Sequence, residues 1–161
     1  MTDQPGCSCG SDDAPTVQRI IFPCAGVANV GQITNCAAIQ LTEEGYGGAA
    51  CVALLATGSE GLKANLATTD EIIILDGCPV ACATKIANMQ GIHVDQAVII
   101  TELGITKAGS PDYTDEDIET VVSAVWEGVG RTGESKRSPL HTGDEPDNDS
   151  KSPGCGCGGK C

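Results

Sequence analysis

Apolar runs rich in β-branched residues alternate along the chain with segments of helical periodicity. The clearest run, Ile72 to Leu75, is short and continuous, which is typical of a strand buried on both faces of a sheet. The sequence also predicts strands over residues 17–22 and 96–101. The segment 47–58 is apolar but ambiguous, because it fits either a buried strand or a strand followed by a loop.

Helices are predicted between these strands, where apolar residues recur at spacings of three and four. The predicted helices cover residues 32–44, 60–67 and 79–89. Gly45 follows the first of them and supplies the positive φ that a helix C-cap requires.

A last helix is predicted after Thr114. Thr114 and Asp117 resemble a capping box, and the acidic residues at 115–117 complement the helix dipole. Strand and helix alternation predicts an α/β fold, a three-layer, Rossmann-like or flavodoxin-like arrangement with a mostly parallel sheet and helices on both faces. The apolar stripe of the last helix comprises Ile118, Val121, Val122, Val125 and Val129.

The composition changes at both ends of the chain. Residues 1–15 are polar and predict a flexible N-terminal arm. Residues 16–130 then form one α/β domain. Residues 131–161 predict a flexible linker and a C-terminal tail rich in cysteine and glycine.

The net charge of −13 argues against nucleic-acid or anionic-membrane partners, which require basic patches. No apolar run approaches the roughly 20 residues that span a bilayer, and the N-terminus lacks the features of a signal peptide. We therefore expect a cytoplasmic protein, in which thiols stay reduced. Ten cysteines in that compartment indicate metal or redox chemistry, with a metal ion as the expected partner and no protein partner indicated.

Two thiols follow the central strand. Pro79 suits the first position of a helix, so Cys78 is the expected N-cap and Cys82 lies four residues on, on the same helix face. The positive end of a helix dipole favours the thiolate, which is the form that binds metal or attacks an electrophile. The alternative is that both are small buried core residues.

The other cysteines occupy different settings. Cys24 lies just past the first strand, and ligands of open α/β sheets bind at the carboxyl ends of strands. Cys51 lies in the ambiguous segment, whereas Cys36 is interpreted as core packing inside the first helix, with a ligand role as the alternative. Glycine surrounds the last three thiols, which have no packing role and are interpreted as accessory. The thiols of the two terminal segments are Cys7, Cys9, Cys155, Cys157 and Cys161.

Four short motifs of the sequence occur in the same order as the motifs of a known protein family. They are Cys24-Ala-Gly-Val-Ala-Asn-Val-Gly31, Cys51, Ile74-Leu-Asp-Gly-Cys-Pro-Val-Ala-Cys82 and Glu102-Leu-Gly-Ile-Thr-Lys107. The chain thereby resembles the DGC domain family, which is named after its central Asp-Gly-Cys motif and for which zinc binding is proposed. The resemblance implies four chelating cysteines, and these fall on Cys24, Cys51, Cys78 and Cys82. It implies a site more than a biological role.

Asp76 and Lys85 flank the central thiols and are candidates for supporting the site. Asp76 would orient the backbone or cap the helix, although an Asp after a strand is often only a turn former. Lys85 would stabilise a thiolate, or else lie on a solvated helix face. His93 and His141 are isolated, and we expect neither to be a ligand.

Three functions remain open. The first, which we favour, is a zinc-binding protein whose metal is structural or sensory, with no catalysis; an iron–sulfur cluster is the alternative cofactor. The second is a thiol redox or sulfur-handling enzyme with Cys24 or Cys78 as nucleophile and Cys82 as resolving thiol. The third is metal delivery by the C-terminal thiols, because flexible thiolates bind and exchange soft ions.

Overall fold

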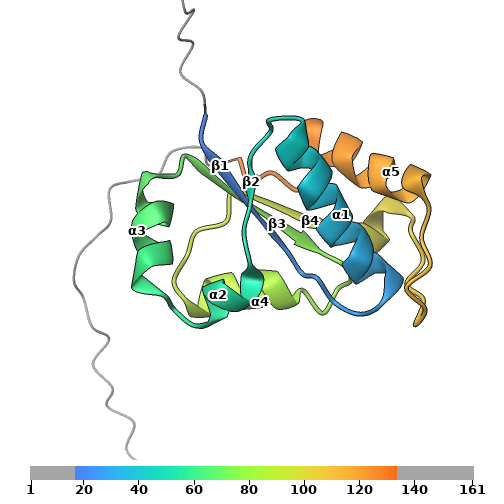
Figure 1. Ribbon diagram of the computed structural model, residues 1–161, viewed down its shortest axis with the longest axis horizontal. Helices are drawn as coiled ribbons and strands as arrows, with labels where there is room; N and C mark the ends of the chain where they lie inside the picture. The colour runs from blue at the N-terminus through green and yellow to red at the C-terminus, as the bar shows by residue number, and fades with distance from the viewer. Residues whose placement is uncertain (1–16, 134–161) are drawn as a thin grey trace, which may run out of the picture.

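The computed structural model describes residues 17–133, which form a four-stranded, all-parallel sheet between two layers of helices (Figure 1). The predicted α/β fold is therefore confirmed. The strands are β1 (Arg19–Pro23), β2 (Gly48–Ala49), β3 (Glu71–Asp76) and β4 (Gln96–Ile99).

The strand order is β2-β1-β3-β4. The chain leaves β1 toward β2 on one side, and β3 then pairs with β1 on the other side. This order is that of the first four strands of a flavodoxin-like sheet, and it places the topological switch point between β1 and β3. Ligands of such folds bind outside the carboxyl ends of the strands at that point.

Each face of the sheet has its own core. Helices α1 (Asn29–Glu43) and α5 (Asp115–Trp126) cover one face, where Ile21, Ile73 and Leu75 are fully buried. Phe22 and Ile74 point to the opposite face, as the alternation of side chains along a strand requires. The helices on that second face are α2 (Val52–Ala56), α3 (Glu60–Thr68) and α4 (Cys82–Met89) (Figure 1).

The end of β4 differs slightly from the prediction. The predicted strand over 96–101 ends at Ile99 and continues as a 3-10 helix, η1 (Ile100–Leu103). The ambiguous segment also resolves differently, because the two-residue β2 is followed by α2, a helix that the apolar pattern did not predict. Gly47, just before β2, passes close to β1, and a Cβ there would lie only 2.7 Å from Arg19 Cβ.

The prediction that the central helix begins at Pro79 is wrong. Residues 78–81 form a turn instead, in which the Ala81 N–H donates to the Cys78 carbonyl over 2.9 Å. Pro79 occupies the second position of that turn, which its fixed φ suits equally well. Helix α4 then begins at Cys82, so Cys78 is not its N-cap, and the two thiols do not share a helix face.

The last helix forms as predicted, with one correction. Thr114 and Asp117 make the reciprocal hydrogen bonds of a capping box. Val129, however, lies beyond the end of α5 at Trp126 and is 41% exposed, so it is not part of the apolar stripe.

The chain remains attached to the sheet just beyond α5. Arg131 forms an antiparallel bridge with Gln96, and its side chain pairs with Glu71 over 2.7 Å. The predicted N-terminal arm, nearly all of the predicted linker and all five terminal thiols lie outside the described residues. Within residues 17–133, no helix has the length and apolar character that crossing a bilayer requires.

Candidate functional site

Three thiols follow three adjacent strands at one edge of the sheet. Cys24 comes directly after β1, while Cys51 and Cys78 each come two residues after the ends of β2 and β3. The Cys24 N–H donates to the Leu75 carbonyl over 2.8 Å, which extends the pairing of β1 and β3 up to the thiol. Cys24 and Cys78 therefore flank the switch point, where a ligand is expected.

Two glycines allow the loops at this edge to approach each other closely. A Cβ at Gly31 would lie 2.3 Å from the Gly26 carbonyl oxygen, and a Cβ at Gly77 would lie 3.0 Å from Val30 Cγ2. The first contact is impossible without a shift of the backbone, and the second is tight enough that Val30 would have to give way by a few tenths of an ångström. Glycine at 31 and 77 thus packs the loop after β1 and the loop after β3 against the start of α1.

Asp76 caps α4 from the end of β3. Its Oδ1 accepts from the Ala83 N–H over 2.9 Å, and its Oδ2 accepts from the N–H and the hydroxyl of Thr84 over 3.1 and 2.7 Å. The carboxylate is buried and all three donors belong to the first turn of the helix, which otherwise lacks a side-chain cap. Asp76 is therefore a helix cap that fixes where Cys82 lies.

The Cys78 thiol lies beside two hydrogen-bond donors, the Val80 N–H and the Lys107 ammonium. The Val80 N–H donates to it, and this hydrogen bond lowers the pKa of Cys78 below that of a free thiol. Lys107 contributes to the same shift, since its Nζ lies 3.4 Å from Cys78 Sγ. Partial burial and the negative charge of Asp76 oppose the shift without reversing it. Cys78 therefore ionises more readily than a free thiol.

Sequence reasoning missed Lys107 and proposed Lys85 instead. Lys85 is exposed on α4, whereas Lys107 contacts the thiol from the loop that precedes α5. The loop is fixed by Asn29, whose side-chain amide donates to the Thr106 carbonyl over 3.0 Å and accepts from the Ala108 N–H over 2.7 Å. The sequence did hold a clue to the role of Lys107, because it is one of only four basic residues between positions 16 and 130.

The four predicted ligands share the edge but differ in exposure. Cys24 and Cys78 are half-buried, while Cys51 and Cys82 are exposed. Within residues 17–133, no three side chains among His, Cys, Asp and Glu stand close enough together to hold one metal ion. The fold therefore places Cys24, Cys51 and Cys78 after adjacent strands and Cys82 at the start of α4, without gathering their side chains into a metal shell.

Two non-glycine residues in the described part of the chain have a left-handed backbone, and each adjoins one of these cysteines. Ala25 has φ 51° and follows Cys24, and Ala81 has φ 50° and precedes Cys82. A side chain in this conformation costs on the order of 1–2 kcal/mol, and such strain concentrates at functional sites.

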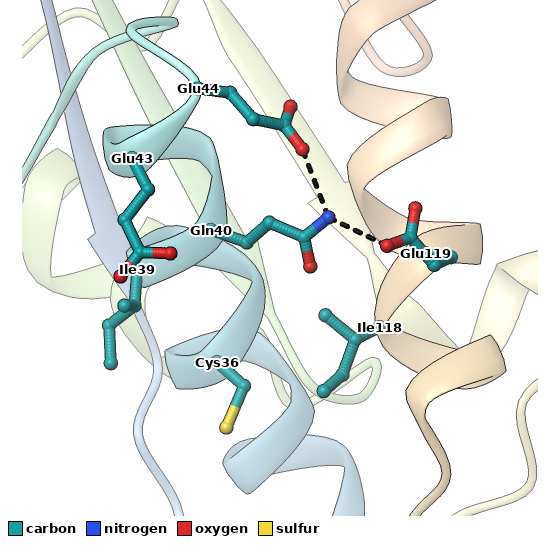
Figure 2. Close-up of a pocket in the computed structure, with 7 residues that line it drawn as sticks. All are labelled: Cys36, Ile39, Gln40, Glu43, Glu44, Ile118 and Glu119. Carbon is teal, nitrogen blue, oxygen red and sulfur yellow. Dashed lines mark hydrogen bonds between the residues drawn. The ribbon is translucent and has the colours of Figure 1, made fainter.

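Cys36 lies apart from this edge, and its interpretation as a core residue is wrong. Its Sγ is 3.2 Å from the Tyr113 hydroxyl, and this contact raises the pKa of Tyr113. It lines an open groove of about 550 Å³ between α1 and α5. Figure 2 shows Gln40 above it, bridging Glu44 and Glu119 with hydrogen bonds of 2.9 and 2.8 Å.

The strand order defines a doubly wound α/β protein, in which cysteines follow the carboxyl ends of three adjacent strands. A model of the DGC domain matches residues 20–125, and the chain belongs to the DGC domain family. The matched range contains all four predicted ligands, as well as Asn29 and Lys107. No curated protein and no solved structure matches the chain.

The donor set fits zinc in its chemistry. Four thiolates are a common shell of structural Zn²⁺ sites, and thiolate sulfur selects soft or borderline metals over Mg²⁺ or Ca²⁺. Three of these residues follow neighbouring strands and the fourth opens α4, but their side chains would have to move to surround one ion. Cys7, Cys9, Cys155, Cys157 and Cys161 lie outside the described residues, so metal delivery by terminal thiols remains a prediction.

Proposed function

We propose that this protein binds zinc at the carboxyl edge of its sheet, with Cys24, Cys51, Cys78 and Cys82 as thiolate ligands. The observation that carries the proposal is the placement of thiols after β1, β2 and β3, three strands that are adjacent in the sheet although distant in sequence. Core packing would not place two of these four residues in exposed positions.

Bound zinc would act as a structural tie among these loops. A shell filled by four thiolates leaves no open position for water or substrate, which is the arrangement of structural sites. Cys78 is the ligand best prepared for this role, because a thiol must lose its proton to bind metal and its pKa is already lowered.

Closing the shell requires the loops to adjust. Cys51 is the N-cap residue of the five-residue helix α2, and Cys82 follows the strained Ala81. Both lie at element boundaries, where small backbone changes redirect a side chain. Metal sites of this kind couple ligand binding to local folding, so we expect zinc to order residues 51–52 and 78–82.

Metal content tests the proposal. Zinc per chain is measured in full-length protein purified without added metal, then in the C78S/C82S double variant and in C36S as a matched control. We expect bound zinc in the wild type and in C36S, and its loss in the double variant. A wild type without metal, or a double variant that keeps it, contradicts the proposal.

The contact between Lys107 and Cys78 supports a second candidate function, thiol chemistry in which the Cys78 thiolate attacks an electrophile. The distinguishing observation is a protein isolated without metal in which Cys78 is the first cysteine to be alkylated near neutral pH, as mapped by mass spectrometry. Uniformly slow alkylation of all cysteines argues against this function.

A further inference from the structure

We propose that Lys107 is the charge-compensating residue of the cysteine site, and that Asn29 is the positioning residue that holds it there. The proposal deepens the proposed zinc binding and, where it concerns the metal, rests on it. Its basis is the contact of 3.4 Å between Lys107 Nζ and Cys78 Sγ.

A cation is needed at this edge because the site is strongly negative. Four thiolates around one divalent ion carry a net charge of about −2. The protein around them is also acidic, since residues 16–130 hold four basic and fourteen acidic residues. An ammonium beside a thiolate lowers the electrostatic cost of gathering such charges.

The other basic residues of this range are placed differently. Arg19 pairs with Glu71 over 2.6 Å, and Lys63 pairs with Glu60 over 3.1 Å. Lys85 is exposed on α4, three residues after Cys82. Lys107 alone among these four makes a described contact with a thiol. Lys63 therefore serves as a control for total charge, and Lys85 as the competing candidate.

Asn29 fixes the backbone on both sides of Lys107. Its side chain bonds to Thr106 and Ala108, and its own N–H donates to the Ser110 carbonyl over 2.9 Å. Asn29 is buried at the first turn of α1, with 7% of its surface exposed. The loop is thus held to the start of α1, and this anchorage positions Lys107 Nζ within 3.4 Å of Cys78 Sγ.

A first experiment needs no zinc. In metal-free full-length protein, Cys78 is alkylated with anionic iodoacetate and with neutral iodoacetamide at one pH, and the ratio of the two rates is taken. The ratio cancels the fraction of thiolate and reports only the local charge. We expect K107M to lower the ratio by about two- to fivefold, the range of an exposed ion pair, while K107R and K63M preserve it.

The same ratio separates positioning from charge. N29A keeps every charge of the chain, and we expect it to lower the ratio in part, with helical content checked by circular dichroism. A ratio unchanged in K107M overturns the role of Lys107, and a ratio unchanged in a folded N29A overturns that of Asn29. If the ratio of alkylation rates falls equally in K107M and K85M, it reports the overall electrostatic field of the protein and not the contact of Lys107, which also contradicts the proposal.

A second experiment concerns the metal. Zinc affinity is measured by competition with a chromophoric chelator for the wild type, K107M, K85M and K63M. We expect K107M to bind zinc about tenfold more weakly than the wild type, which is the lower end of the effect of groups that support metal ligands. The difference in zinc affinity should become smaller at high salt, because salt screens the charge of Lys107. Unchanged affinity in K107M overturns the compensating role. A wild type that binds no zinc refutes the proposed function, while the alkylation ratios still decide the role of Lys107.

Discussion

Asp76 Oδ2 accepts two hydrogen bonds from Thr84, one from the backbone and one from the hydroxyl, across the junction of β3 and α4. This pair explains the first residue of the central Asp-Gly-Cys sequence as a cap for the helix that carries Cys82. Gly77 permits close packing against α1, and Cys78 presents the polarised thiol. Each residue of the motif therefore has a separate physical task.

Replacing Asp76 tests the capping role. D76A leaves three donors of the first turn without their partner, and we expect it to lower the free energy of unfolding by about 2 kcal/mol, the sum of a lost cap and buried unsatisfied groups. Chemical denaturation measures the loss. D112A, at an exposed position before α5, is the control and should change little. Equal stability of D76A and the wild type would disprove the cap.

Replacing Gly31 tests the close approach of the loops. G31A would place a Cβ 2.3 Å from the Gly26 carbonyl oxygen, and overpacking of this kind costs about 1–3 kcal/mol or more. Gly109 provides the matched control, because a Cβ there meets nothing within 4 Å. We expect G31A to lower the thermal midpoint clearly and G109A to leave it nearly unchanged. If the two variants melt together, the loops are not packed as described.

Replacing Ala81 tests the strained turn beside Cys82. Glycine adopts positive φ at no steric cost, so we expect A81G to stabilise the metal-free protein by up to about 1 kcal/mol, measured by chemical denaturation. An alanine-to-glycine change within a helix acts in the opposite direction, and A87G, at a buried position in α4, is the comparison. A destabilised A81G would show that the left-handed conformation is not strained.

The pH dependence of alkylation tests the state of Cys78. Because its pKa is lowered, chiefly by the Val80 N–H and then by Lys107, its rate in metal-free protein should reach half its maximum at a pH below about 8.5, the value for a free thiol. The rate falls as the pH drops through the lowered pKa and the thiolate is protonated. K107M should move the midpoint upward only in part, since the backbone donor remains. A midpoint at or above the free-thiol value contradicts the assignment.

The strands and most helices were predictable because their signals are local. The run Ile72 to Leu75 and the stripe of α5 report burial directly, and the Thr114 capping box is readable within four residues. The start of α4 was not predictable, because Pro79 suits a turn as well as a helix. Its actual cap, Asp76, acts from a strand seven residues before the nearest donor.

The positions of Cys24 and Cys78 after strands were predictable from the sequence. Cysteines placed after strands lie at one edge once the strands are parallel neighbours, and the sequence indicated a mostly parallel sheet, but the strand order β2-β1-β3 became known only from the fold. The partner of Cys78 was not predictable, because the loop with Lys107 has no periodicity and is held by Asn29 from 77 and 79 positions away. Contacts of that range are fixed only by the complete fold.

The spectrum of bound Co²⁺ tests most directly whether the four sulfurs share one metal shell. The full-length chain with Cys7, Cys9, Cys155, Cys157 and Cys161 changed to serine removes the terminal thiols as competing ligands. We predict that it binds one Co²⁺ with strong thiolate-to-metal absorption, and that C24S, C51S, C78S and C82S each weaken this band while C36S preserves it. If the protein no longer binds Co²⁺ once the terminal thiols are removed, the shared shell is contradicted. An absorption band that C24S and C51S leave unchanged would contradict it as well.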